Sequence, residues 1–338
     1  MIDILAVKPH KVSRSLRGYT TLLYSQPKAG KSRTAARFPK ALFLATEIGY
    51  LAIPNVMAVP ITSWSEFKQA LRQLKQPAAH EAYETIVIDT IDILADLCEK
   101  YVCSQNGVDK ISEVPFGGGY SQMRHEFDEG LRSIPMMGYG LVMISHAEDR
   151  TFTDEDGKEF NQIVPTLPKS PRLIVDRMSD IICYAAPEQQ EDGSVKMIGY
   201  LRGTPRFVAG SRFKYIVPRI EFNYDSLVKA IGDAIDKEEE AVPGGVVSDD
   251  DTTMQDIKSN IDGAADFDKV IGEFNKMVVA IQEKAGSTFA SAWAPKIQAT
   301  IEKYLGRGKK IRDATPSQVE QVTLVVDDLR EQMTKAGI

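Results

Sequence analysis

The sequence predicts an α/β fold in which a mainly parallel sheet is sandwiched by helices, followed by a small all-α domain. Short apolar runs alternate with segments of helical period over residues 19–236, as in proteins whose strands are joined by crossover helices. The first of these runs leads into a loop that contains Gly-Lys-Ser and then into a helix. Residues 253–338 show helical period and lack strand signals, which predicts the separate helical domain.

Composition limits the function classes. The 338 residues carry a formal net charge of −6, so any binding to nucleic acid would depend on local basic patches. Cys98, Cys103 and Cys183 lack Cys-x-x-Cys spacing and are odd in number, which favours free thiols in a reducing compartment over a zinc site or a disulfide framework. No apolar run approaches the roughly 18 residues of a membrane-spanning helix, and the N-terminus lacks the apolar core of a signal peptide. We therefore expect a soluble, cytoplasmic protein with no membrane partner.

A phosphate-binding loop is the feature on which the functional prediction depends. Residues 20–24 predict a strand and residues 33–38 a helix. Between them the chain reads Ser25, Gln26, Pro27, Lys28, Ala29, Gly30, Lys31 and Ser32, and Arg33 follows. In such a unit the backbone N–H groups of the loop and the helix N-terminus bind phosphate oxygens. Lys31 is then expected on the β- and γ-phosphates of ATP, and the Ser32 hydroxyl on Mg²⁺.

Ser25 departs from the usual pattern, in which glycine opens the loop. If this position requires a positive φ, a non-glycine residue costs about 1–2 kcal/mol. That cost corresponds to roughly a tenfold loss of affinity. The alternative to the whole motif is a chance Gly-Lys-Ser on a surface turn.

Three polar residues follow predicted buried strands. Glu47 comes just after the run 41–45, Asp89 ends the run 85–89, and His146 follows the run 140–145. Because open α/β sheets bind ligands at the carboxyl ends of their strands, all three are expected beside the nucleotide. Asp89 would support Mg²⁺, Glu47 would act as the base for an attacking water, and His146 would sense the γ-phosphate. The alternatives are that Glu47 is an acid on a surface loop, that Asp89 merely ends a buried strand, and that His146 has a structural role.

The remaining elements complete the sheet and its helices. A strand is expected at 56–61, and the capping box Ser63-x-x-Glu66 opens the helix after it. Asp156-Gly157 and Asp192-Gly193 predict two hairpins. We also expect a strand at 180–184 and helices at 91–103, 121–134, 168–177 and 225–236.

Several segments are candidates for contact with single-stranded DNA. Phe116 and Tyr120 flank three glycines in a predicted mobile loop over 104–119, and aromatic faces stack with unpaired bases. Aromatics tucked into the core are the equal alternative. The full set of candidates is Phe116, Tyr120, Arg150, Arg202, Arg206, Lys309 and Lys310. Lys309 and Lys310 stand in a basic turn that would otherwise be a solvated inter-helix loop.

The run 202–219 is the densest basic stretch of the main domain, and arginine dominates it. It predicts either a cationic finger that reaches a neighbour's ATP or a contact with DNA phosphate. A solvated hairpin edge, protected by charge against aggregation, is the alternative.

An acidic stretch separates the two domains. Residues 237–252 combine high charge with low apolar content, which predicts a disordered linker. The resulting organisation is a basic lead-in at 1–18, an ATPase core at 19–236, the linker at 237–252 and a helical domain at 253–338.

Taken together, the motifs over about residues 15–235 resemble the phage-encoded RecA-like AAA ATPases of the Sak recombinase group, fourth type. The resemblance depends on the segments 27–32, 86–90, 116–120, 144–147, 164–169, 202–204 and 209–212. It implies a RecA-like core with ATP-dependent binding of single-stranded DNA and annealing during recombination. Carried over to this sequence, it implies Lys31, Ser32 and Asp89 as the nucleotide and metal residues, with Glu47 as the water-activating acid. His146 matches the sensor, and Arg212, with Arg202 second, is the choice for a finger that acts across a subunit interface.

The resemblance also implies partners. Subunits would assemble into a ring or filament around single-stranded DNA, and a single-strand-binding protein is a candidate partner of the C-terminal domain. Two rival readings use the same nucleotide site. One is an ATPase loader or motor for a replicative helicase, and the other is a nucleotide-gated DNA-binding scaffold with little turnover.

Overall fold

The computed structural model describes residues 12–242, 247–248 and 267–338, which form two compact units divided between residues 248 and 267. The larger unit contains one sheet with the strand order β11-β9-β8-β2-β6-β5-β3-β4. The parallel strands are β2 (Thr20–Ser25), β3 (Ala41–Ala45), β4 (Met57–Pro60), β5 (Thr85–Asp89), β6 (Gly140–Thr153) and β8 (Ile181–Gln189). The antiparallel strands are β7 (Glu159–Pro165), β9 (Val195–Tyr200), β10 (Gly210–Ser211) and β11 (Arg219–Glu221). The predicted mainly parallel sheet is confirmed.

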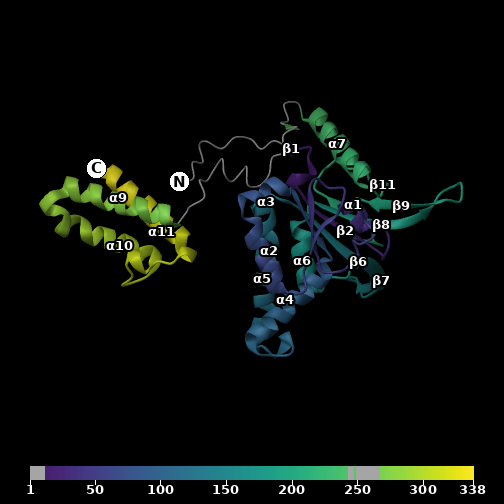
Figure 1. Ribbon diagram of the computed structural model, residues 1–338, viewed down its shortest axis with the longest axis horizontal. Coiled ribbons are helices and arrows are strands. Elements are labelled where there is room, and N and C mark those ends of the chain that lie inside the picture. The colour runs from purple at the N-terminus through teal and green to yellow at the C-terminus, as the bar shows by residue number, and fades with distance from the viewer. Residues whose placement is uncertain (1–11, 243–246, 249–266) are drawn as a thin grey trace. The chain divides into compact units, whose positions relative to one another are not determined.

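Helices cover both faces of the sheet, because successive strand residues point to opposite sides. Leu22, Ile86 and Ile88 share a core with the helices on one face, and Leu23 and Val87 share the core of the other. The first face is covered by α2 (Trp64–Leu74), α4 (Ile91–Asn106), α5 (Gly118–Met136) and α6 (Lys169–Met178) (Figure 1). The second is covered by α1 (Lys31–Ala35) and α7 (Tyr224–Ala241), and the short α3 (Pro77–Ala82) joins α2 to β5.

The strand register brings the ends of β2, β3 and β5 to the level of His146 in β6. Ser25 pairs with His146 across β2 and β6, and Asp89 pairs with Ile144 across β5 and β6. Ala45 of β3 pairs with Asp89. The chain therefore leaves β2, β3 and β5 at the same level, which we call the carboxyl edge, and β6 passes His146 at that level.

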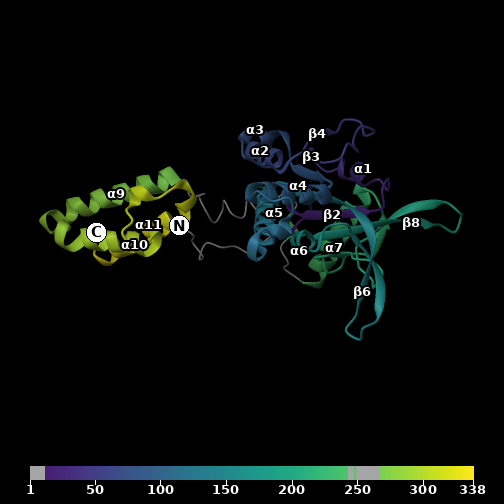
Figure 2. The same cartoon turned by 90° about the horizontal axis from the view of Figure 1, so that it is seen from below.

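Two hairpins extend beyond the sheet (Figure 2). Both turns that the sequence predicts are present: β6 and β7 pair across Asp156-Gly157, and β8 and β9 pair across Asp192-Gly193. The strands are longer than predicted, since β6 runs to Thr153 and β8 to Gln189. Residues beyond the buried parts of these strands alternate in exposure, so the apolar runs marked only the buried parts.

The predicted loop over 104–119 is largely wrong. α4 continues to Asn106, two short 3₁₀ turns follow at Ile111–Glu113 and Pro115–Gly117, and α5 begins at Gly118. Of the three glycines, Gly119 allows close packing of α5 against the turn at Ile111. A Cβ on Gly119 would lie 2.8 Å from the backbone oxygen of Ile111.

The end of α7 also differs from the prediction. The helix runs to Ala241, so the first five residues of the expected linker 237–252 are helical. Lys and Glu are good helix formers, and Arg14 forms ion pairs with Asp236 and Glu239 on this helix. Val247–Ser248 pair as β12 with β1 (Val12–Ser13). The rest of the predicted linker after Val242, and residues 1–11 of the basic lead-in, lie outside the described residues.

The second unit contains helices and turns but no strand among the described residues 267–338, as the sequence predicts. It consists of α9 (Phe267–Ala285), a π-turn (Phe289–Trp293), α10 (Ala294–Leu305) and α11 (Val319–Lys335). Its core contains Phe274, Ile281, Trp293, Val326 and Leu329. In neither unit does the described part of the chain contain a helix of sufficient length and apolar character to cross a membrane.

Candidate nucleotide site

The phosphate loop lies between β2 and α1, with Gly30 as the residue before the helix. Gly30 has a φ of 89° and Lys28 a φ of 65°, so these two residues take the left-handed conformation of the loop. Ser25 is instead the last, fully buried residue of β2 and is not among the residues with positive φ. The strain predicted for Ser25 is therefore absent, because the strand ends one residue later than its apolar run.

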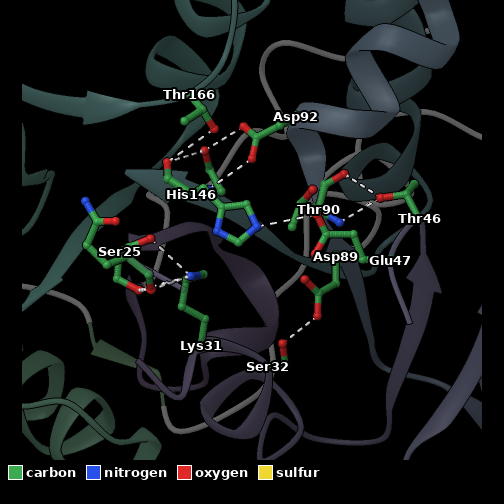
Figure 3. A network of polar contacts seen from close by, with 12 residues as sticks. Ser25, Lys31, Ser32, Thr46, Glu47, Asp89, Thr90, Asp92, His146 and Thr166 are labelled. Atoms are coloured by element: carbon green, nitrogen blue, oxygen red, sulfur yellow. Dashed lines mark hydrogen bonds and ion pairs between the residues drawn. The ribbon is translucent and has the colours of Figure 1, made fainter. Parts of the chain in front are cut away.

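Lys31 is buried under the loop that precedes it. Its Nζ donates to the backbone oxygens of Ser25 and Gln26, both at 3.1 Å, and to Ser25 Oγ at 3.0 Å (Figure 3). Burial lowers the pKa of Lys31, and the nearby carboxylates of Asp89, Asp92 and Glu47 act in the opposite direction. The Ser25 hydroxyl thus accepts a hydrogen bond from the buried lysine.

Ser32 and Asp89 meet as the sequence predicts. Ser32 Oγ donates to Asp89 Oδ2 at 2.6 Å. Burial raises the pKa of Asp89, and the hydrogen bond from Ser32 lowers it. Hydroxyl and carboxylate oxygens are hard donors of the kind Mg²⁺ takes, and Mg²⁺ usually completes its shell with water and substrate phosphate. The described residues contain no group of three or more His, Cys, Asp and Glu side chains that would hold a metal alone. Ser32 and Asp89 therefore fit a Mg²⁺ ion that arrives with a nucleotide.

Glu47 and His146 also lie together at the carboxyl edge. His146 Nε2, on β6, is 3.4 Å from Glu47 Oε1, which lies in the loop after β3. His146 Nδ1 and Thr90 Oγ1 are buried and have no hydrogen-bond partner within the described chain. Because buried polar atoms are rarely left unpaired, both atoms are available to a ligand at this edge.

Asp92 is a site residue that the sequence analysis missed. It lies in the first turn of α4 and accepts hydrogen bonds from Ser145 Oγ at 2.6 Å and from the His146 backbone N–H at 3.0 Å. Thr166 donates its backbone N–H to the His146 oxygen at 3.0 Å. Burial raises the pKa of Asp92, while the hydrogen bonds from Ser145 and His146 lower it. The available signal was its position three residues after Asp89, at the helix start that faces the same edge.

A cavity of about 510 Å³ opens beside the phosphate loop. Gly30, Arg33 and Arg37 line one side. The other side is formed by residues that no motif marked, namely Ile53, Pro54, Met197, Phe222, Asn223 and Tyr224. Ligand pockets typically combine apolar walls with a few polar groups, so this cavity fits the nucleoside part of a nucleotide. Most of its far wall, at Met197 and at 222–224, comes from segments more than 150 residues later in the chain, which explains why the sequence alone did not show it.

The predicted arginines lie elsewhere. Ser211 pairs with Ile181, and Thr21 pairs with the same residue, so Arg212 lies at the opposite, amino end of the sheet from the phosphate loop of its own chain. Its side chain is 64% exposed and contacts Asp180 and the Arg177 oxygen. Arg202 donates to the oxygens of Phe213 and Lys214.

The other candidates for DNA contact differ in their surroundings. Arg150 is held by Glu148 and the Leu167 oxygen, whereas Arg206 is exposed and forms no side-chain hydrogen bond or ion pair within the described residues. Phe116 is fully exposed with a φ of 57°, and Tyr120 is 52% exposed in the first turn of α5. Their alternative placement in the core is excluded. Lys309 and Lys310 are exposed in the turn after α10 of the second unit.

A family model covers the residues of the carboxyl edge. This model, described as an AAA domain, matches residues 17–213. The chain is 29% identical to the SPbeta prophage-derived uncharacterized protein YorG of Bacillus subtilis, over 98% of both chains. Among solved structures, it aligns with the flagellar accessory protein FlaH from Methanocaldococcus jannaschii at a TM-score of 0.29 and 12% identity, covering 54% of this chain and 77% of that one.

Proposed function

The chain belongs to the AAA domain family, and from this premise we propose that it is an ATP-hydrolysing phage recombination protein that binds single-stranded DNA and promotes annealing. Family membership supports ATPase activity in general. The prophage origin of a relative that aligns over almost its whole length supports a phage source. The DNA part of the proposal draws its support from Phe116 and Tyr120, since exposed aromatics suit the stacking of unpaired bases.

One observation carries the proposal: the fold brings Lys31, Ser32 with Asp89, and Glu47 with His146 to a single edge. Lys31 would exchange its loop oxygens for the β- and γ-phosphates. When bound beside Ser32 and Asp89, Mg²⁺ neutralises charge on the phosphates. Glu47 would orient the attacking water and accept its proton. His146 would turn from Glu47 toward the γ-phosphate, leaving the carboxylate free for that water.

The same histidine connects the nucleotide to the DNA-binding elements. Its backbone is bonded to Asp92 on one side and to Thr166 on the other. Thr166 directly follows β7, and α6 begins three residues later. A change at His146 is thereby transmitted to the β6–β7 hairpin and to α6, so the loss of the γ-phosphate would release DNA.

We assign Arg212 to the site of a neighbouring copy. It is exposed at the amino end of the sheet, while the phosphate loop lies at the carboxyl edge. A head-to-tail contact would bring these two ends together, and such a contact generates rings or filaments. In NTPases an arginine finger supplied in this way increases the rate by about 10³–10⁵.

The experiment is an ATPase assay with and without an oligo-dT strand, on the wild type and Lys31→Ala. Lys75→Ala, which changes an exposed lysine after α2 and outside the phosphate loop, is the control. We expect turnover that DNA stimulates, a loss of at least ~100-fold in Lys31→Ala, and near wild-type activity in the control. A wild-type rate that is indifferent to DNA would contradict the recombination role. Strand separation in place of annealing would favour the helicase-motor alternative.

A further inference from the structure

A second cavity, of about 420 Å³, lies between α5 and α6 and is distinct from the nucleotide site. The two helices lie side by side in both views (Figures 1 and 2). Met123, Ile174 and the partly exposed Leu173 supply apolar surface to it, and Tyr120 lies along α5. We call this cavity the α5–α6 groove.

Cations border the groove. Arg124 on α5, together with Lys169 and Arg177 on α6, line it, and all three are exposed. Within the described residues, none of these three side chains forms a hydrogen bond or ion pair. Arg132 also lines the groove, but Asp128 holds it at 2.7 Å.

The acidic groups that face these cations do not cancel them. Asp128 is already paired with Arg132, and Glu99 of α4 is the other carboxylate in the lining. The groove therefore retains a positive charge on a chain whose formal net charge is −6. A concave surface of one sign concentrates ligands of the opposite sign.

We propose that the α5–α6 groove binds the phosphate backbone of single-stranded DNA, with Tyr120 stacking on a base at the α5 start. The inference deepens the proposed function, on which it rests, by assigning Arg124, Lys169 and Arg177 as phosphate contacts. Spaced, unpaired cations beside an aromatic face are the combination that binds single strands without sequence preference. The assignment also gives a role to Phe116, which lies fully exposed just before α5.

The groove is connected to the nucleotide site through α6. Lys169 is the first residue of α6 and lies three residues after Thr166, which is bonded to the backbone of His146. A shift of His146 would therefore alter the position of Lys169 relative to Arg124. This arrangement would make the affinity of the groove for DNA depend on the bound nucleotide.

The test measures binding of a fluorescent oligo-dT strand by anisotropy at several salt concentrations, using the full chain with a non-hydrolysable ATP analogue. The test variant is Arg124→Ala/Lys169→Ala. The matched control is Arg72→Ala/Lys75→Ala, which removes one exposed arginine and one exposed lysine from a cavity between α2 and α5.

Each phosphate contact on a single strand contributes about 0.7 to the slope of log K against log salt. We expect the test variant to lose about 1.4 of the wild-type slope and the control to keep the full slope. Equal slopes for the wild type and the test variant would show that the α5–α6 groove does not bind DNA phosphate, while leaving the proposed function intact. Equal losses in both variants would overturn the groove assignment as well, since general charge would then explain the binding.

Two further outcomes separate the sources of failure. A wild-type protein that does not bind the strand at all would overturn the proposed function and the groove together. A polyglutamate probe tests an acidic protein segment as the occupant. If the test variant loses polyglutamate binding but keeps DNA binding, the groove is a protein-docking surface and our assignment is wrong.

Discussion

The sequence predicts the carboxyl edge as the ATP site and the segment 202–219 as either a finger for a neighbour's ATP or a contact with DNA phosphate, and the two regions are built in different ways. At the carboxyl edge, polar side chains from elements far apart in the sequence bind one another, as in Ser32 with Asp89 and His146 with Glu47. In the arginine segment, Arg202 and Arg212 bind backbone oxygens of their own neighbourhood. The edge is thus a preorganised site within one chain, whereas the segment is a surface whose use depends on another molecule.

The largest effect is expected from Arg212→Ala, which tests whether the arginine segment acts on another molecule. If Arg212 completes a neighbour's site, the variant keeps ATP binding but loses about 10³-fold or more in turnover. Steady-state ATPase rates check this. Arg219→Ala, which removes a similarly exposed arginine paired with Glu188, should stay near the wild-type rate.

Mixing variants sharpens the result. Lys31→Ala keeps its arginine and Arg212→Ala keeps its phosphate loop, so mixed assemblies would regain activity that neither variant has alone. A mixture that stays as inactive as its components would show that Arg212 does not act between subunits.

Glu47→Gln tests the catalytic part of the carboxyl edge. We expect a loss of about 10²–10⁴-fold in turnover, because the amide cannot accept a proton from water. ATP affinity, measured by calorimetry, should change little. If affinity and turnover fall together, Glu47 holds the site together rather than acting as the base.

Asp89→Asn tests how much the buried carboxylate lowers the stability of the folded protein. Burial raises the folded-state pKa of Asp89, so the folded state binds this proton more readily than the unfolded state. The contribution of Asp89 to folding stability therefore falls as the pH rises above about 4, the ordinary pKa of aspartate.

The nucleotide-free Asp89→Asn variant should lose that part of the pH dependence and melt no lower than the wild type at neutral pH. Its affinity for Mg²⁺–ATP should fall by roughly tenfold, since one metal ligand is lost. Thermal melting with and without nucleotide measures both effects, with the exposed Asp96→Asn as the control. A variant that binds Mg²⁺–ATP as the wild type does would remove Asp89 from the site.

The smallest effect is expected at Ser25. Ser25→Ala removes a hydroxyl that competes with phosphate for the Lys31 ammonium, and one such hydrogen bond contributes about 1 kcal/mol. ATP should then bind about fivefold more tightly in both Ser25→Ala and Ser25→Gly. Backbone strain would instead give a gain with glycine alone, so calorimetry on the two variants decides between the explanations.

The site residues that the sequence predicted are those whose place is fixed by their position along a parallel strand. Glu47, Asp89 and His146 follow buried runs, and parallel pairing brings the ends of such runs to one level whatever the strand order. Asp92 and the cavity wall at Met197, Phe222 and Tyr224 depend on how a helix and late segments pack, which carries no local signal. The mobile loop predicted around 117–119 is wrong because Gly119 marks close packing and Gly117 marks a positive φ of 69° just before α5.

The most direct measurement of the central claim is the affinity of an oligo-dT strand in the presence of a non-hydrolysable ATP analogue, ADP or no nucleotide. If the carboxyl edge reads the γ-phosphate and controls DNA binding, the analogue should tighten binding by at least about tenfold over ADP, which is a coupling free energy of ~1.4 kcal/mol. Lys31→Ala should remove this difference. Equal affinities in all three states of the wild type would contradict the account.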